Sequence, residues 1–155
     1  IEPVETKENL RIEELVIVVD TSYSTSGELV KKFLRETFTI LSETDSFFRK
    51  RKIHIIQCDE LVHSDITVTG DTDIDILINN FELAGGGNTD FRPAFEYVNN
   101  LIDTGQIKKL QGLLYFTDGK GKYPKKKMPY NTAFVFIDKL SETAVPAWAM
   151  KVSLE

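Results

Sequence analysis

The chain has 155 residues, of which 41% are hydrophobic and 28% charged, and its formal net charge is −5. This length and composition are typical of one globular domain with a sizeable core. The acidic balance disfavours general binding to nucleic acid or acidic membranes, and no apolar run approaches the roughly 20 residues that span a bilayer.

The N-terminal residues and the cysteine content indicate the extent of the domain and its cellular location. Residues 1–12 are polar and charged, so we predict a lead-in there and a single domain over 13–155. No signal-peptide pattern is present, and the single Cys58 rules out an internal disulfide. Both observations favour a cytoplasmic location. Because the chain begins at Ile1 rather than Met, we expect it to be a fragment or a processed product.

The first predicted elements are a strand and a helix. An apolar, mostly β-branched run at 15–19 ends on Asp20, which is typical of a central strand buried on both faces of a parallel sheet. A polar loop follows over 21–27. Apolar residues then recur at helical spacing over 29–41.

The middle of the chain is predicted to form a hairpin and two helices. Strands at 52–58 and 65–69 lie close enough in sequence to pair as a hairpin. Residues 71–81 have the length of a helix, which Asp71 would cap. After a glycine-rich loop, apolar residues on one face predict a second helix over 91–102.

The last third supplies further strands. Residues 112–117 form an apolar run that ends on Asp118; a basic loop follows over 119–130, and strands are predicted at 133–137 and near 147–152. Alternation of strands with helices indicates an α/β, doubly wound fold with a mostly parallel sheet, one antiparallel edge strand and helices on both faces. Ligands of such sheets bind at the carboxyl ends of strands.

Three short motifs lie where that rule places a site. The first reads D-x-S-x-S, with oxygen donors at Asp20, Ser22 and Ser24. A glycine-rich loop then presents Thr89, and Asp118 follows the later strand. Hard cations such as Mg²⁺ prefer oxygen ligands. Taken singly, each motif has an ordinary structural explanation, such as a helix cap or a flexible turn, and Asp90 is interpreted as a helix cap.

Together, the motifs resemble the metal-ion-dependent adhesion site of von Willebrand factor A (VWA) domains, and the resemblance covers about residues 13–152. It implies a Rossmann-like VWA fold. It also implies one divalent metal, Mg²⁺ with Mn²⁺ and Ca²⁺ as alternatives. The implied metal residues are Asp20, Ser22, Ser24, Thr89 and Asp118.

The resemblance also implies how such a site is used. A metal held mainly by neutral hydroxyls stays electrophilic and can take a carboxylate oxygen from an Asp or Glu of a protein partner. A rim of Tyr23, Asn88, Lys120 and Lys122 would contact that partner. Bacterial VWA proteins often work with MoxR-type AAA+ ATPases, which makes such an ATPase a candidate partner; neither nucleic acid nor membrane is expected.

A closer resemblance is to the bacterial VWA-like domain at the C-terminus of predicted metallopeptidases. It rests on the runs at 85–97, 115–119 and 145–151. The zinc motif H-E-x-x-H of those proteins is absent, because neither His54 nor His63 lies in it. We therefore expect this domain not to be an enzyme.

Two other functions stay open. A phosphatase resembling the haloacid dehalogenases also places an Asp after an apolar strand, but it needs a second carboxylate two residues later, where this chain has Ser22. The other alternative is a VWA-like scaffold whose metal site is not used.

Overall fold

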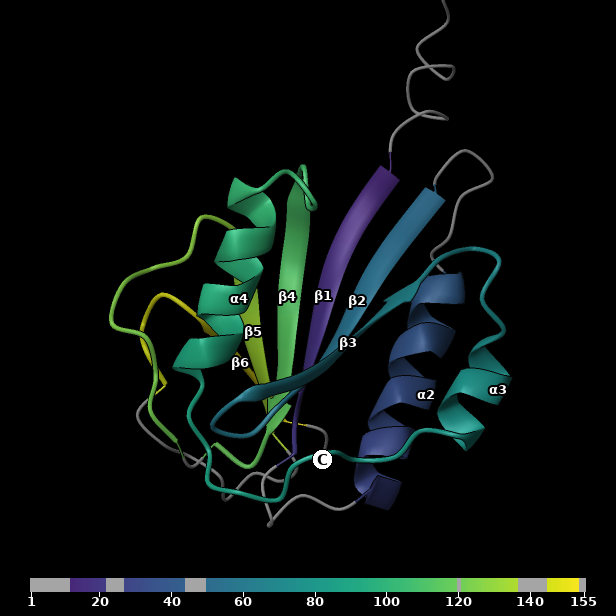
Figure 1. Cartoon of the computed structure of the whole chain (residues 1–155), viewed down its shortest axis with the longest axis horizontal. Helices are drawn as coiled ribbons and strands as arrows, with labels where there is room; N and C mark the ends of the chain where they lie inside the picture. The colour runs from purple at the N-terminus through teal and green to yellow at the C-terminus, as the bar shows by residue number, and fades with distance from the viewer. Residues whose placement is uncertain (1–11, 22–26, 44–49, 120, 137–144, 154–155) are drawn as a thin grey trace, which may run out of the picture.

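The computed structural model describes residues 12–21, 27–43, 50–119, 121–136 and 145–153 (Figure 1). Its six strands form one sheet in the order β3-β2-β1-β4-β5-β6. The strands are β1 (Ile12–Asp20), β2 (Lys50–Cys58), β3 (Val62–Val68), β4 (Leu110–Thr117), β5 (Asn131–Phe136) and β6 (Met150–Ser153).

The direction of the strands agrees with the sequence prediction. β1 runs parallel to β2 and β4, and β5 runs parallel to β4 and β6. Among the strands that the structure describes, only the pair of β2 with the edge strand β3 is antiparallel. β1 lies between β2 and β4, where its side chains from Val16 to Val19 are at most 1% exposed. Consecutive burial of this kind requires layers on both faces of the sheet.

Helices supply those layers. The helices are α2 (Gly27–Glu43), α3 (Ile74–Asn79) and α4 (Arg92–Asp103). Val16 and Val18 belong to the hydrophobic cluster that includes α4, whereas Ile17 and Val19 belong to the cluster that includes α2 and α3. Figure 1 accordingly shows α4 on one side of the strands and the other two helices on the opposite side. The predicted doubly wound α/β fold is therefore confirmed.

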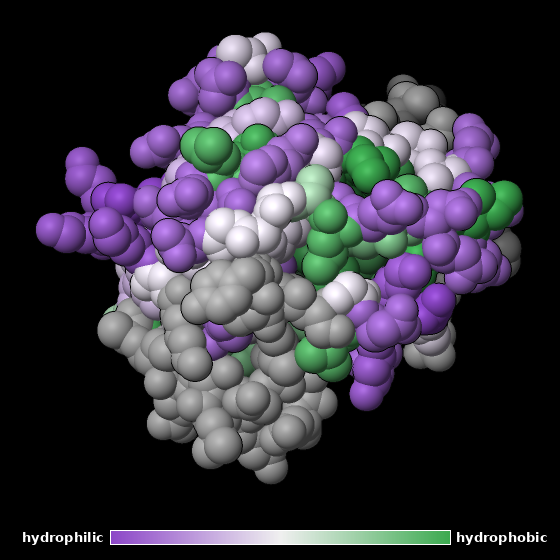
Figure 2. Space-filling view, turned by 60° about the horizontal axis from the view of Figure 1, so that its bottom comes forward, coloured by the Kyte–Doolittle hydropathy of each residue, from purple (hydrophilic) through white to green (hydrophobic). Residues whose placement is uncertain are grey.

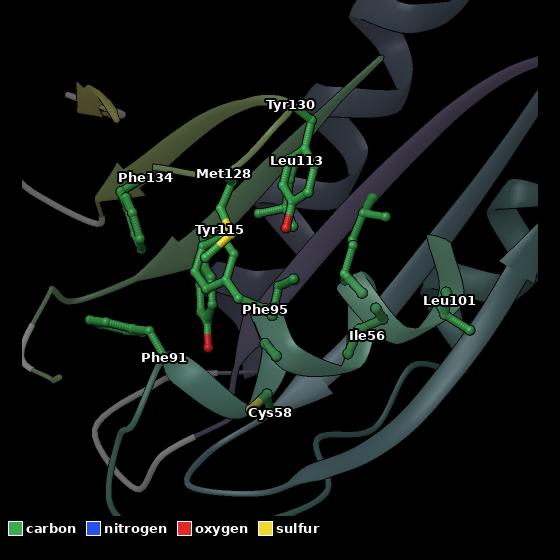
Figure 3. Close-up of a cluster of buried hydrophobic side chains, with 14 of the residues drawn as sticks. Ile56, Cys58, Phe91, Phe95, Leu101, Leu113, Tyr115, Met128, Tyr130 and Phe134 are labelled. Atoms are coloured by element: carbon green, nitrogen blue, oxygen red, sulfur yellow. The ribbon is translucent and has the colours of Figure 1, made fainter. Parts of the chain in front are cut away.

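The cluster under α4 is rich in aromatic rings (Figure 3). Phe91 packs at 5.0 Å from Tyr115 and at 5.4 Å from Phe134, measured between ring centroids. The basic loop after β4 joins the same cluster through the buried Met128 and Tyr130. The apolar residues near its end therefore anchor this loop to the core.

The prediction for α3 was wrong in its start and its cap. Residues 69–72 form a turn in which Thr72 N–H donates to the carbonyl of Thr69 and Thr69 N–H donates to Thr72 Oγ1. The turn uses the residues that were expected to start the helix. Asp73, rather than Asp71, caps α3, because its carboxylate accepts from Ile76 N–H at 3.1 Å.

Other boundaries differ by a few residues. β1 begins at Ile12, inside the predicted lead-in, and β3 begins at Val62 instead of residue 65. The predicted end of the fifth strand at residue 137 lies outside the described residues. In the described part of the chain, no helix is both long and apolar enough to cross a membrane.

Candidate metal centre

The carboxyl ends of the parallel strands β1, β2 and β4 lie at one edge of the sheet, the lower edge in Figure 1. Of the five predicted metal residues, Asp20, Thr89 and Asp118 are described there. The other two, Ser22 and Ser24, lie outside the described residues. So do two of the four predicted rim residues, Tyr23 and Lys120.

Asp20 and the start of the Asp118 loop are joined by a threonine hydroxyl. Asp20 ends β1 and is fully buried. Thr117 ends the neighbouring strand β4, and its Oγ1 donates to Asp20 Oδ2 at 2.6 Å. The same Oγ1 accepts from the backbone N–H of Gly119 at 3.1 Å. Thr117 therefore connects the two carboxylate-bearing segments, a role that the sequence did not reveal.

The Asp118 loop also lies against Thr89. The backbone N–H of Phe91 donates to the carbonyl of Lys122 at 3.0 Å. A Cβ at Gly121 would lie 2.7 Å from Thr89 Cγ2 and 3.0 Å from the ring of Phe91. Only glycine permits this approach, so Gly121 sets the distance between the two loops.

The segment after Asp20 is fastened to two neighbours. Thr21 N–H donates to the carbonyl of Cys58 in β2 at 3.1 Å, and Gly86 N–H donates to the carbonyl of Thr21 at 2.8 Å. Gly85 has φ +123°, and a Cβ there would lie 2.7 Å from Thr21 Oγ1. That hydroxyl is buried and has no hydrogen-bond partner among the described residues. These contacts place the loop that carries Thr89 beside the end of β1.

A carboxylate outside the predicted set lies in the same network. Asp59 directly follows β2 and is 4% exposed. Its Oδ2 accepts from Gly87 N–H at 3.0 Å, and its Oδ1 accepts from Leu61 N–H at 2.9 Å and lies 2.8 Å from His63 Nε2. Burial alone would raise the pKa of Asp59, but these hydrogen bonds outweigh it and hold the pKa below its usual value. In the sequence, the one sign of a role for Asp59 is its position directly after the predicted strand at 52–58.

The remaining predicted residues have plainer surroundings. Asp90 Oδ1 accepts from Arg92 N–H at 3.1 Å, at the first residue of α4. The N-cap of α4 is Phe91, without a side-chain cap hydrogen bond, so the interpretation of Asp90 as the helix cap was wrong. The side chain of Arg92 also donates to both of its carboxylate oxygens. The rim residues Asn88 and Lys122 are exposed, so both are accessible to a partner.

The chemistry of these donors fits a hard divalent cation. The described candidates offer two carboxylates and one hydroxyl, which are oxygen ligands. Burial raises the pKa of the nearby Cys58 thiol to about 12, and a hard cation prefers oxygen to sulfur ligands. Among the described residues, no group of three or more His, Cys, Asp or Glu could hold a metal. The predicted site does not depend on such a group, since three of its five residues are hydroxyl donors.

A six-stranded, doubly wound sheet with these motifs at the carboxyl ends of β1 and β4 is the architecture of a VWA domain. The chain belongs to the family described as "VWA-like domain (DUF2201)", whose sequence model matches residues 15–155. No curated protein matches the chain significantly.

Solved structures share the fold at low sequence identity. The SpRpn10 VWA domain is 13% identical with a TM-score of 0.59, covering 93% of this chain and 88% of that one. The conserved hypothetical protein BatB from Bacteroides thetaiotaomicron is 14% identical with a TM-score of 0.59, covering 81% and 67%. An aerotolerance-related membrane protein from Bacteroides fragilis, with multiple mutations to serines, is 14% identical with a TM-score of 0.56, covering 80% and 67%.

Proposed function

We propose that this domain is a metal-dependent protein-interaction module. One divalent cation, Mg²⁺ with Mn²⁺ or Ca²⁺ as substitutes, is held by Asp20, Ser22, Ser24, Thr89 and Asp118. The bound metal takes a carboxylate oxygen from an Asp or Glu of the partner, and the domain itself is not an enzyme.

One observation carries the proposal. The three described candidate ligands belong to three segments that contact one another: Thr117 joins the segments of Asp20 and Asp118, and the absent side chain of Gly121 lets the Asp118 loop touch Thr89. Segments far apart in sequence thus bring candidate ligands to one edge of the sheet, and all of these candidates are oxygen donors. An all-oxygen donor set of this kind favours Mg²⁺ over softer metals.

The surroundings favour a polar partner. Figure 2 brings the loop-bearing edge of the sheet forward, and much of its described surface is hydrophilic. Lys122 and residues 125–127, all lysines, are exposed on the loop after β4. An acidic partner segment would be attracted by these charges while one of its carboxylates reached the metal.

The wider context of the proposal follows the family resemblance. The domain is the C-terminal part of a larger bacterial protein of the predicted metallopeptidase group, acts in the cytoplasm, and has a MoxR-type AAA+ ATPase as its candidate partner. BatB and the SpRpn10 VWA domain share only its fold at 13–14% identity, so neither identifies the partner.

A phosphatase is disfavoured by the residue two positions after Asp20. A phosphatase resembling the haloacid dehalogenases needs a second carboxylate there as acid and base, whereas this chain has Ser22. Hydrolysis of a generic aryl phosphate that Asp20→Ala abolishes would nevertheless establish the enzyme and overturn the proposed function.

The direct test is a calorimetric titration of the domain with Mn²⁺, repeated in the presence of Mg²⁺ as a competitor. Thr89→Val replaces the candidate hydroxyl by a methyl group of similar size, and we expect it to weaken Mn²⁺ binding by about tenfold or more. Thr104→Val is the matched control, since Thr104 lies at the far end of α4 and donates to the carbonyl of Asn100.

Partner capture is tested by a pull-down from the source cell in Mg²⁺ and in EDTA. The proposal predicts proteins that are retained in Mg²⁺ and lost in EDTA or with Thr89→Val. No Mn²⁺ binding by the unaltered domain would instead leave a VWA-like scaffold without a used metal site.

A further inference from the structure

Asp59 is not among the candidate metal residues, yet it contacts the backbone on both sides of Thr89. Its Oδ2 accepts from Gly87 N–H at 3.0 Å, and its backbone carbonyl accepts from Asp90 N–H at 3.2 Å. The two residues between these anchors are Asn88 and Thr89. We propose that Asp59 is a positioning residue that sets the place of Thr89 at the metal site; this inference rests on the proposed function.

The orientation of the Asp59 carboxylate is itself fixed. Its other oxygen, Oδ1, accepts from Leu61 N–H at 2.9 Å and lies 2.8 Å from His63 Nε2. With Oδ1 engaged by Leu61 of the β2–β3 connection and by His63 of β3, Oδ2 is directed to the glycine-rich loop. The side chain of Asp59 is only 6% exposed, so water competes little for these hydrogen bonds.

The surroundings of each glycine at 85–87 agree with a positioning role for Asp59. A Cβ at Gly85 would lie 2.9 Å from Asp59 Oδ2, and a Cβ at Gly87 would lie 3.0 Å from the same atom. By contrast, a Cβ at Gly86 would meet nothing within 4 Å. Glycines at 85 and 87 thus let the backbone approach the carboxylate, which gives the loop its close contact with Asp59.

The β2–β3 hairpin offers a matched control in Asp65. Its carboxylate also pairs with a histidine, at 2.9 Å from His54 Nδ1, and also accepts a second hydrogen bond, from Tyr97 Oη at 2.6 Å. Neither of these two contacts involves the glycine-rich loop. Loss of Asp65 should therefore lower stability without moving Thr89.

The first experiment titrates Mn²⁺ into the unaltered chain, Asp59→Asn and Asp65→Asn at a temperature where all three are folded by circular dichroism. An asparagine at 59 has one acceptor oxygen, so its NH₂ group faces either Gly87 N–H or Leu61 N–H. We expect the Kd for Mn²⁺ to rise about tenfold in Asp59→Asn and to stay unchanged in Asp65→Asn.

A second pair of variants tests the same contact without changing any charge. This pair also keeps the proposal testable if Asp59→Asn does not fold. Gly85 has φ +123° and Gly86 has φ +105°, so Gly85→Ala and Gly86→Ala both introduce backbone strain. Only the new methyl group at 85 collides with Asp59 and Thr21. Gly85→Ala should weaken Mn²⁺ binding more than Gly86→Ala, with every charge kept in place.

A metal-free readout separates positioning from general stability. Backbone amides at Gly87 and Asp90 should exchange hydrogen faster in Asp59→Asn and Gly85→Ala than in their controls, since both donate to Asp59 in the native chain.

The outcomes distinguish the two proposals. If the unaltered chain binds Mn²⁺ and Asp59→Asn and Gly85→Ala bind it equally well, the positioning role is wrong and the metal site stands. If the unaltered chain binds no Mn²⁺, the proposed function fails, and the positioning role that rests on it fails as well.

Discussion

The hairpin of β2 and β3 contains two aspartate–histidine pairs that form hydrogen bonds with different parts of the molecule. Asp59 lies 2.8 Å from His63, and Asp65 lies 2.9 Å from His54. Asp59 has Gly87 N–H as a further donor, whereas Asp65 has the hydroxyl of Tyr97 in α4. One pair joins the hairpin to the loop of the candidate metal centre, and the other joins it to a helix.

The difference comes from position along the hairpin rather than from the chemistry of the pairs. Asp65 lies within β3, opposite Ile56, where the sheet face is covered by the cluster under α4. Asp59 lies past the end of β2, beside the glycine-rich loop. The same hydrogen-bonding side chains thus stabilise helix packing in one place and loop position in the other.

The largest expected effect on stability is from Asp65→Ala. It removes the acceptor of both His54 and Tyr97, and hydrogen bonds to a charged group contribute about 1.5–3 kcal/mol each. We expect the free energy of unfolding in urea to fall by about 3 kcal/mol, with Mn²⁺ affinity retained. A loss below about 1 kcal/mol would show that α4 does not depend on this carboxylate.

Acid should weaken both pairs. Burial would raise the pKa of Asp65, but hydrogen bonds from His54 and Tyr97 outweigh it and hold the pKa low, as those at Asp59 do. A carboxyl whose folded pKa is depressed stabilises the native state above its unfolded pKa, about 4. That contribution is lost as the pH falls through the folded pKa.

Urea midpoints measured from pH 7 to pH 3 test this expectation. The free energy of unfolding should fall below about pH 5, and it should fall less steeply in Asp59→Asn and in Asp65→Asn than in the unaltered chain. Equal slopes in all three proteins would mean that neither carboxyl has a depressed pKa.

Tyr97→Phe should have a smaller effect, because it removes one donor and leaves the pair of Asp65 with His54 intact. A loss of about 1.5 kcal/mol in unfolding free energy is expected. The pKa of the Tyr97 phenol, raised to about 12 by burial and by Asp65, gives a second check: spectrophotometric titration should return it toward 10 in Asp65→Asn.

The smallest effect is expected at the surface pair of Asp90 and Arg92. The planar guanidinium of Arg92 holds its donors in a fixed geometry, and the distance from Arg92 Nη2 to Asp90 Oδ2 is short at 2.7 Å. The Arg92 side chain is nevertheless 50% exposed. Exposed ion pairs contribute little because water and salt screen them. Thermal unfolding of Arg92→Ala should therefore differ least from the unaltered chain; a midpoint as low as that of Asp65→Ala would contradict the ranking.

Local patterns made the fold predictable, and long-range contacts explain what was missed. The apolar run before Asp20 identified a central strand, since burial on both faces leaves an uninterrupted signal. The cap of α3 was misplaced because Asp71 and Asp73 both suit a helix start, and the turn at 69–72 decides between them.

At the candidate site, the sequence indicated residue types but not their supports. Motifs singled out Thr89 and Asp118, whereas the roles of Asp59, Thr117 and Gly121 depend on partners from distant segments. The Asp20–Thr117 hydrogen bond, for example, joins residues 97 positions apart, and no local periodicity reports such a contact.

That separation has a consequence for the order of folding. β1 pairs with β2 on one side and with β4 on the other, and the hairpin of β2 and β3 and the three helices α2, α3 and α4 lie between β1 and β4 in the chain. Closing so long a loop is entropically costly and slow. We therefore expect the edge that unites Asp20 with the Asp118 loop to be completed late, so that the proposed metal site would form only when nearly the whole sheet has assembled.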